Sequence, residues 1–355
     1  MTVYLHGIST ALPEFCLDQT EVEQRAGLIF GDKYPQFHRL SRSFRSAGIK
    51  TRHSVVPLDW FSESHGWADR NAAFIQGATA LFCDAARSAL KASGWSAQSV
   101  DCVVTVCSTG IATPSLEAQV HKDMGFRDDI MRVPVFGLGC AGGVSGLSLA
   151  QSIAAGRAGF RVLLVVVETC SLSFRADRLQ KADIIAAVLF GDGAAAACLC
   201  DQAPDAGPMV QLGQGYQKLW PDTLQIMGWD IDETGFGVVF DRSIPDFVNA
   251  EFAQATTAAL AASGLQHSQI DRYICHPGGA KVVAAIETAL ELEADTLDKE
   301  RDILREAGNM SAPTVMFVLK SVLEAGRTGQ FMACALGPGF TASYLPVHVS
   351  AGQGA

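Results

Sequence analysis

The sequence predicts an α/β protein built from two related halves, in which sheets of buried strands are covered by helices. Two observations carry this prediction. A pattern of helices and strands recurs about 170 residues later in the chain. The strand-length segments, such as 162–167, are continuous apolar runs, which indicates that both faces of the sheets are covered. We therefore expect helices between the halves as well as outside them.

The first repeated element is a segment that leads into a strand. Residues 89–101 read ALKASGWSAQSVD, and residues 259–271 read ALAASGLQHSQID. Each segment passes through a Ser-Gly pair, which is a helix-stop signal, and each runs into an apolar stretch. This order predicts a helix, a turn and a buried strand in both halves.

The second repeated element begins at Gly139-Cys140 and again at Gly308-Asn309. Each pair opens a run of small and apolar residues that ends in Ala-Gly-Arg before another strand. The alternation of helix and strand is typical of parallel strand–helix–strand units. Farther along, the matching turns contain GDG and GPG, and the first half has an extra segment of roughly 24 residues before this turn.

A turn-rich stretch, DQAPDAGP at residues 201–208, separates the two halves. It predicts a boundary between an N-terminal half, 1–205, and a C-terminal half, 206–355.

Composition narrows the classes of protein. Charged residues make up 18% of the chain, against about 25% in a typical protein, so we expect part of the surface to be buried in an oligomer. The net charge of −10 argues against nucleic-acid binding. No apolar stretch approaches the roughly 20 residues of a membrane span. The ten cysteines lack zinc-site spacing, so we expect a cytoplasmic protein with reduced thiols and no metal.

Cys140 differs from the other cysteines because it precedes a helix and is flanked by Gly139, Gly142 and Gly143. A sulfur atom at a helix N-terminus is predicted to favour the thiolate. His276 ends a strand and enters the sequence HPGG, at the kind of sheet edge where α/β sites form. Taken singly, a buried cysteine and a lone histidine are also compatible with purely structural roles.

The duplication links these residues to Asn309, which is the repeat equivalent of Cys140. Elements related by duplication place Cys140, His276 and Asn309 at matching edges, so we expect the three to converge. A cysteine can hold an acyl group as a thioester. Histidine and asparagine N–H groups can stabilise an oxyanion or an enolate. No acidic general base is needed where decarboxylation creates the carbanion.

The motifs around these residues resemble those of the type III polyketide synthases, the chalcone and stilbene synthase family. The resemblance rests on GCAGG at Cys140, HPGGAK at His276, GNMSAPTV at Asn309, and the LFGDG and GPGF sequences, and it covers nearly the whole chain. It implies a thiolase-like, internally duplicated αβαβα layered sandwich. It also implies malonyl-CoA and an acyl-CoA starter as substrates, a homodimer, and no other cofactor.

The resemblance also implies a role for individual residues. Cys140 would hold the starter and the growing chain, while His276 and Asn309 would drive decarboxylation of malonyl-CoA. The other implied residues would shape the cavity: the gatekeeper Phe190, Val238 in place of a second gatekeeper phenylalanine, the small residues Ser173 and Ser311, and the loop residues Gly337 and Pro338. We expect Val238 to widen the passage.

A basic stretch is the predicted site for the phosphates of CoA. Arg39, Arg42 and Arg45 recur every three residues, so one helix would align them, and Lys50 follows closely. The family's phosphate-binding residues fall most closely on Arg39 and Arg42. A solvated helix face is the alternative interpretation.

Three other functions are alternatives to a type III polyketide synthase. A ketoacyl-acyl-carrier-protein synthase III shares the three catalytic residues, but it lacks the GPGF loop and typically reads GNTSAAS near the asparagine. A non-catalytic thiolase-fold partner subunit usually lacks the nucleophile. Thioester hydrolysis offers no role for Asn309. The starter, the number of extensions and the cyclisation remain open, with a weak preference for an alkylpyrone or alkylresorcinol product over one self-primed from malonyl-CoA alone.

Overall fold

The protein is described from a computed structural model over residues 1–31, 33–34, 36–175, 180–205 and 207–352. The described residues form one ten-stranded mixed sheet in the order β12-β13-β14-β8-β1-β7-β6-β4-β5, with β9 paired to β14. Its strands are β1 Val3–Ala11, β4 Cys102–Val106, β5 Met131–Val135, β6 Val162–Thr169, β7 Asp192–Cys200, β8 Met209–Leu212, β9 Tyr216–Leu219, β12 Arg272–Cys275, β13 Gly329–Gly337 and β14 Thr341–Ser350.

The two sets of strands repeat one arrangement. In the first set β4 pairs in parallel with β6, which pairs antiparallel with β7, which pairs antiparallel with β1. In the second set β12, β13, β14 and β8 follow the same order with the same directions. The antiparallel pair of β1 and β8 joins the sets. The predicted internal duplication is therefore confirmed by the topology.

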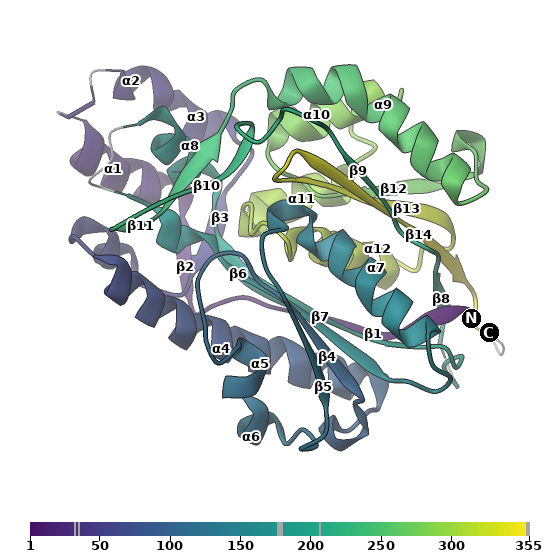
Figure 1. Ribbon diagram of the computed structural model, residues 1–355. Helices are drawn as coiled ribbons and strands as arrows, with labels where there is room; N and C mark the ends of the chain where they lie inside the picture. The colour runs from purple at the N-terminus through teal and green to yellow at the C-terminus, as the bar shows by residue number, and fades with distance from the viewer. Residues whose placement is uncertain (32, 35, 176–179, 206, 353–355) are drawn as a thin grey trace.

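The two sets of strands form two layers with helices between them, as predicted. Figure 1 shows α7 and α12 in this central position. Alternate residues on one strand face different layers: Val104 packs in the central core with these helices, whereas Val103 packs beneath α4. On the second set, Ala333 faces the central core and Met332 faces α9 and α10. The αβαβα sandwich explains why the strands are apolar throughout.

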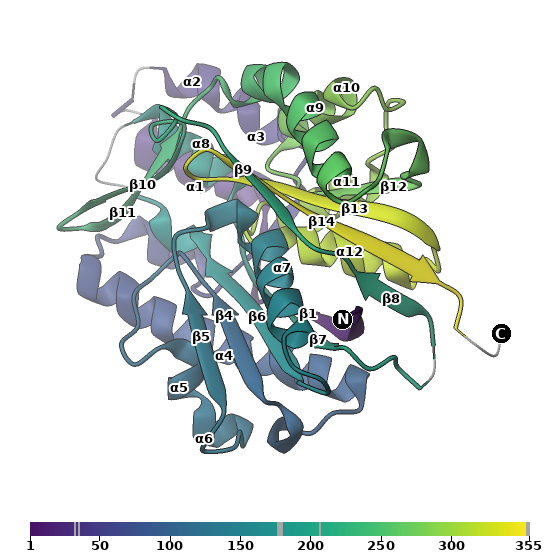
Figure 2. The same ribbon diagram turned by 45° about the vertical axis from the view of Figure 1, so that its right-hand side comes forward.

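The remaining elements surround these layers. Figure 2 shows α7 in front of the sheet, beside β6, and the hairpin of β10 and β11 at one end of the molecule. The helices are α1 Gln19–Phe30, α2 Phe37–Leu40, α3 Arg42–Ser46, α4 Trp67–Ser93, α5 Leu116–Gln119, α6 His121–Met124, α7 Gly142–Ala155, α8 Lys181–Leu189, α9 Ile244–Ala262, α10 Ala280–Ala289, α11 Asp298–Ala307 and α12 Thr314–Glu324. The two small hairpins are β2 Phe15–Asp18 with β3 Thr51–Ser54, and β10 Met227–Asp232 with β11 Gly235–Phe240. Short 3₁₀ helices are η1 Leu58–Ser62, η2 Ala97–Ser99, η3 Gly139–Ala141, η4 Cys170–Ser173 and η5 His267–Gln269.

The predicted helix, turn and strand occur in both halves, where α4, η2 and β4 correspond to α9, η5 and β12. The expectation of parallel units is wrong for the last strands of each half. Because only residues 338–340 lie between β13 and β14, the loop is too short for a parallel crossover, and the strands pair antiparallel. Position 206, at the predicted half boundary, lies outside the described residues, and the boundary stays a prediction.

The extra segment of the first half is residues 170–191, which contain η4 and α8 between β6 and β7. In the second half the corresponding connection is the short loop after Gly337. This segment carries Cys170, Ser173 and Phe190, all of which line cavities near Cys140. The asymmetry between the halves therefore places side chains over one end of the duplicated core.

No helix in the described part of the chain is both long enough and apolar enough to cross a membrane.

Candidate active site

Cys140 lies in η3, immediately before α7, and only 7% of the residue is exposed. The turn depends on glycine. Gly139 has φ of +46°, and a Cβ atom there would lie 2.6 Å from the ring of Pro338. A Cβ atom on Gly143 would lie 2.3 Å from the carbonyl oxygen of Ala312. These close approaches pack the start of α7 against the start of α12 and fix the position of the thiol.

A hydrogen-bonded path connects Cys140 to Asn309. The Ser311 hydroxyl donates to the Cys140 sulfur at 3.4 Å, and the Ser311 N–H donates to Asn309 Oδ1 at 2.8 Å. Asn309 Nδ2 in turn donates to the Gly278 carbonyl oxygen at 3.1 Å. The amide of Asn309 is therefore held on both sides, and one of its two N–H donors is left for another acceptor.

His276 reaches the same region through Gly278. Its backbone N–H donates to the Cys334 carbonyl at 2.9 Å, which holds the residue at the end of β12. Its Nε2 lies 3.7 Å from the position that a Cβ atom on Gly278 would take, so the ring lies against the glycine that binds Asn309. Both ring nitrogens are buried, and neither has a hydrogen-bond partner among the described residues. The structure thus links Asn309 to Cys140 through Ser311 and places His276 beside Gly278, whose carbonyl binds Asn309.

The electrostatics of the site differ from the sequence expectation. Burial raises the pKa of the Cys140 thiol to about 11, although the Ser311 hydrogen bond acts in the opposite direction. Burial likewise lowers the pKa of the His276 imidazole to about 3. Burial therefore opposes the thiolate that the helix N-terminus is expected to favour, and it favours the neutral form of both groups.

The cavity beside Cys140, named here the Cys140 cavity, has a volume of about 40 Å³. Of the residues that the resemblance implies, Phe190, Val238, Ser311 and Pro338 line it. Gly337 instead packs beneath it, because a Cβ atom there would lie 2.7 Å from Ala141 Cβ. The full lining is Ser108, Thr109, Gly139, Cys140, Cys170, Phe190, Met227, Gly228, Trp229, Val238, Val239, Phe240, Ser311 and Pro338.

Sequence reasoning missed two residues near Cys140. Trp229 pairs with Val238 across the β10–β11 hairpin, lines the Cys140 cavity, and donates its indole N–H to the Ser108 carbonyl at 2.8 Å. The space that Val238 leaves is therefore bordered by a large ring. Glu168 is fully buried and accepts from Thr109 at 2.8 Å, and burial raises its pKa to about 8. Neither residue lies in a motif that marks it.

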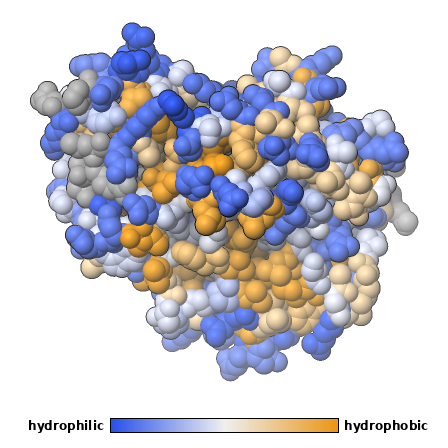
Figure 3. Space-filling model, turned by 45° about the horizontal axis from the view of Figure 1, so that its top comes forward, coloured by the Kyte–Doolittle hydropathy of each residue, from blue (hydrophilic) through white to orange (hydrophobic). Residues whose placement is uncertain are grey.

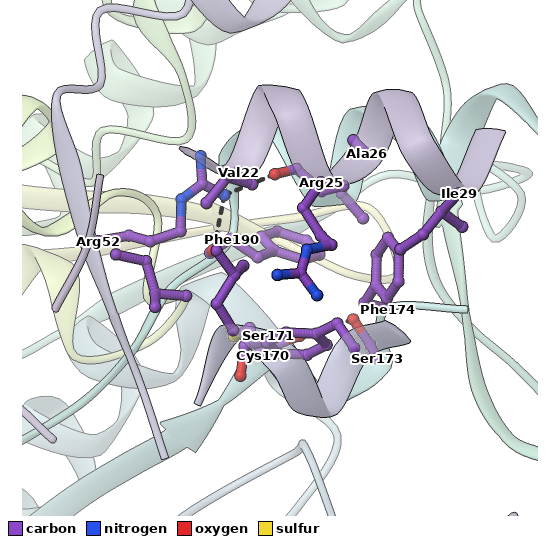
Figure 4. Close-up of a pocket in the computed structure, with 15 residues that line it drawn as sticks. Val22, Arg25, Ala26, Ile29, Arg52, Cys170, Ser171, Ser173, Phe174 and Phe190 are labelled. Carbon is purple, nitrogen blue, oxygen red and sulfur yellow. Dashed lines mark hydrogen bonds between the residues drawn. The ribbon is translucent and has the colours of Figure 1, made fainter. Parts of the chain in front are cut away.

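An apolar pocket, named here the α1 pocket, adjoins the Cys140 cavity, since Phe190 and Cys170 line both. Figure 4 shows residues from α1 on one side of it and η4 on the other. Ser173 lines this pocket rather than the Cys140 cavity, and its hydroxyl donates to the Cys170 carbonyl. The pocket is lined by Leu17, Val22, Arg25, Ala26, Ile29, Arg52, Leu58, Phe61, Cys170, Ser171, Ser173, Phe174, Ala186, Ala187 and Phe190.

A groove of about 580 Å³, named here the α3 groove, meets the Cys140 cavity at Phe240. The side chains of Lys181, Arg242 and Lys281 line it, and the sequence analysis did not select them. It is also lined by Leu40, Ser43, Ser46, Ala47, Ala182, Ile185, Val188, Leu189, Phe240, Asp241, Ile244, Pro245, Gly278, Gly279, Ala280 and Val282.

The predicted phosphate-binding residues Arg39, Arg42, Arg45 and Lys50 are exposed, and none lines this groove. The expected single helix is interrupted at Ser41, which separates α2 from α3. Each predicted arginine is followed by the residue that faces the groove, and Arg45 pairs with Glu23 at 3.3 Å. The residues that face the groove, Leu40, Ser43 and Ser46, also recur every three positions, but each lies one position after a predicted arginine.

Comparisons with known proteins agree with the fold and the motifs. The family model of the chalcone and stilbene synthase N-terminal domain matches residues 2–203, and that of the C-terminal domain matches residues 211–349. A 1,3,6,8-tetrahydroxynaphthalene synthase of Streptomyces peucetius subsp. caesius is 37% identical over 95% of this chain and 91% of its own. A putative chalcone synthase of Bacillus subtilis is 32% identical over 96% of this chain and 97% of its own.

The same agreement holds for solved structures. The crystal structure of the 1,3,6,8-tetrahydroxynaphthalene synthase of Streptomyces coelicolor, a bacterial type III polyketide synthase, superposes with a TM-score of 0.92 at 27% identity. The alignment covers 98% of this chain and 100% of that one. The resemblance drawn from the motifs and the predicted fold class are therefore both confirmed. The chain belongs to the chalcone and stilbene synthase family of type III polyketide synthases, which are acyl-transferring condensing enzymes.

Proposed function

We propose that this type III polyketide synthase loads an acyl-CoA starter onto Cys140 and extends it by repeated decarboxylative condensation with malonyl-CoA. The chain then closes to a pyrone or a phenolic ring. The observation that carries this proposal is the path from the Cys140 sulfur through Ser311 to the Asn309 amide, beside an imidazole whose nitrogens are buried and unpaired. The chemistry needs CoA thioesters as substrates and no metal or prosthetic group.

Loading begins with two neutral groups. The unprotonated His276 takes the proton of the Cys140 thiol as the starter arrives, so the thiolate forms only when it can attack. The sulfur bonds to the acyl carbon of the starter, and the bond from that carbon to the CoA sulfur breaks. The departing CoA thiolate takes the proton from the imidazolium, which returns His276 to its neutral form.

Extension uses the same imidazole as a donor. Malonyl-CoA loses its carboxylate as CO₂, and the electron pair moves into the thioester carbonyl to give an enolate. The free N–H of Asn309 and the N–H of neutral His276 stabilise the enolate oxygen. The enolate carbon attacks the acyl group on Cys140, a carbon–carbon bond forms, and the Cys140 thiolate leaves. The extended chain is now a CoA thioester. It returns to Cys140 when the sulfur attacks its thioester carbon and the CoA thiolate leaves, so that another extension can follow.

The α3 groove is the proposed entrance for CoA. It meets the Cys140 cavity at Phe240, and the cations Lys181, Arg242 and Lys281 suit the phosphates of CoA. Arg39, Arg42, Arg45 and Lys50 lie on the adjacent exposed surface and would attract the anionic substrate from a distance. A groove of this kind also suits free CoA thioesters without a carrier protein, in contrast to a ketoacyl-acyl-carrier-protein synthase III.

The proposed starter carries an alkyl chain, and the products are of the alkylpyrone or alkylresorcinol type. The observation that favours this class is the α1 pocket, which is lined mainly by apolar side chains and borders Phe190. An alkyl chain bound there leaves its carbonyl carbon near Cys140.

A malonyl-primed naphthalene synthase is the second candidate. The relative of Streptomyces peucetius, at 37% identity, has that activity in its name, and the small Cys140 cavity beside Trp229 suits a compact starter. Incubation with malonyl-CoA alone and with a panel of acyl-CoA starters, followed by mass spectrometry, separates the candidates. Product from malonyl-CoA alone, unchanged by any acyl-CoA, contradicts the alkyl starter. No polyketide under any condition contradicts the synthase activity.

The proposed assembly is a homodimer in the cytoplasm. Met131 and Phe136, on and beside the edge strand β5, are 49% and 56% exposed, and Figure 3 shows a hydrophobic area on the face that it draws. The ten cysteines are all free thiols, which suits a reducing compartment. Light scattering of the purified chain tests the dimer, and a monomer at micromolar concentration contradicts it.

A further inference from the structure

The α1 pocket has an apolar inner part and a charged outer part. Phe190 and Cys170 line both this pocket and the Cys140 cavity, and Val22 and Ile29 of α1 form part of its apolar wall. Figure 4 shows the side chain of Arg25 extending from α1 into the space between α1 and η4. A cation in a pocket that is lined mainly by apolar side chains needs a partner, because burying an unpaired charge is costly.

The partners of Arg25 come from η1, on the solvent side of the pocket. Its Nη2 donates to Asp59 Oδ1 at 2.6 Å, and its Nη1 donates to the Ser62 hydroxyl. The side chain of Asp59 is 87% exposed, so this ion pair stands at the boundary with water. The pair therefore connects α1 to η1 at the outer end of the pocket.

Arg52 is the other cation among the described lining residues, and it has a different role. It is buried, and its terminal nitrogens donate to the carbonyl oxygens of Ala187, Val188 and Phe190. These bonds hold the backbone at the end of α8 and leave the terminal nitrogens committed. Arg25 is thus the cation whose guanidinium a ligand in the pocket would contact.

We infer that the Arg25–Asp59 pair closes the outer end of the α1 pocket and limits the length of the alkyl starter. This inference rests on the proposed function, since it assumes that the pocket holds the starter chain. A chain that ends before Arg25 contacts mainly apolar side chains. A longer chain would push its methyl end against the guanidinium and separate it from Asp59, which exposes the charge to an apolar group. The limit is thus set by charge as well as by space.

The test measures acylation of Cys140 in the full chain, without malonyl-CoA, across saturated acyl-CoAs from butanoyl-CoA to hexadecanoyl-CoA. Intact-protein mass spectrometry gives the rate for each chain length. The variants are Arg25→Met, which keeps the apolar stem, Arg25→Ala, and Asp59→Asn. The matched control is Arg305→Ala, which removes an exposed ion pair with Asp302 on α11 and does not line the pocket.

We expect the loading rate of the wild type to fall beyond a limiting chain length. Arg25→Met and Arg25→Ala should move that limit to longer chains and raise the rate for the longest substrate about tenfold or more, since no charge is then desolvated. Asp59→Asn should give a smaller shift in the same direction. Arg305→Ala should keep the wild-type profile at every chain length, butanoyl-CoA included.

Two results would overturn the inference: the same limiting length in both Arg25 variants, or an equal loss at every length, which would show that Arg25 only supports the fold. Absence of loading by any alkyl chain, with product formed from malonyl-CoA alone, would also overturn it. Normal loading and a shifted limit, but no extension on adding malonyl-CoA, would support the inference and contradict the proposed function instead.

Discussion

The Ser311 hydroxyl donates a hydrogen bond to the Cys140 sulfur at 3.4 Å, although the two residues are 171 positions apart in the chain. Ser311 also binds Asn309 through its backbone N–H, so it touches both equivalents of the internal repeat. The resemblance implies only that Ser311 is a small residue in the cavity wall. In the structure it is the one direct link between the nucleophile and the asparagine among the described residues.

Removing this link should make Cys140 less acidic. The Ser311 hydrogen bond lowers the pKa of the thiol against the larger effect of burial, so Ser311→Ala raises that pKa further. We expect alkylation of Cys140 by iodoacetamide at pH 8 to slow about tenfold, as the loss of one hydrogen bond to a charged atom implies. Ser145→Ala is the control, because that buried serine binds Ser343 and lies outside the Cys140 cavity. Equal alkylation rates in both variants would show that Ser311 does not activate the thiol.

The pH dependence of this reaction tests the neutral resting site. With the pKa of Cys140 raised to about 11 and that of His276 lowered to about 3, the thiolate fraction grows about tenfold per pH unit from pH 6 to 10. The alkylation rate should follow that slope. A rate that is constant between pH 6 and 8 would show a preformed thiolate–imidazolium pair, which contradicts this description.

The same shift predicts an effect on stability at low pH. Burial depresses the folded pKa of His276 below its unfolded value of about 6.5, so the folded state resists protonation there. The free energy of unfolding is unaffected by this group above pH 6.5, and it decreases as the pH falls from 6.5 toward 3, because the unfolded state then binds a proton that the folded state does not. His276→Gln should therefore show a weaker fall in Tm between pH 7 and 5 than the wild type, by differential scanning calorimetry. An equal fall in the two proteins would contradict the lowered pKa.

Trp229 should influence the product because it lines the small Cys140 cavity opposite Val238. Trp229→Ala enlarges the cavity, so we expect longer or bulkier polyketides in the product mixture, detected by mass spectrometry. Ile231→Ala is the control on the same strand, with a side chain that is exposed and lies outside the cavity. A product pattern that Trp229→Ala leaves unchanged would show that this ring does not limit the growing chain.

The cations of the α3 groove and the arginines predicted from the sequence are alternative sites for the phosphates of CoA. If the α3 groove is the entrance, Arg242→Ala and Lys281→Ala should each raise the KM for malonyl-CoA several-fold with little change in kcat, and the effect should shrink at high salt. Arg39→Ala and Arg42→Ala should change KM less. A larger rise in KM for the Arg39 and Arg42 variants would show instead that the phosphates bind to the residues predicted from the sequence.

Much of the fold was predictable because the repeat is visible in the chain. Matching segments before β4 and β12, and before α7 and α12, determine corresponding layers in both halves. The antiparallel strands were not predicted, because an apolar run such as β14 is the same in either direction. Only the three-residue loop between β13 and β14 carried that information.

The site was predictable in its residues but not in its energetics. Cys140, His276 and Asn309 are marked by motifs, and the structure connects them through Ser311 and Gly278. The pKa of the thiol depends on the balance between the helix N-terminus and burial. Burial depends on how tightly the two halves pack, and no sequence motif shows that. Likewise the groove faces Leu40, Ser43 and Ser46, and a rotation by one residue along a helix cannot be read from spacing alone.

The central claim is that Cys140 carries the acyl chain while Asn309 acts only in extension. Asn309→Ala, incubated with an acyl-CoA and malonyl-CoA, should show the starter as a thioester mapped to Cys140 by mass spectrometry, with extension slowed about 10²–10³-fold, the usual cost of losing an oxyanion donor. The Cys140→Ala variant should show no adduct and no polyketide. Starter-primed polyketide released by Cys140→Ala, or normal extension by Asn309→Ala, would contradict the account.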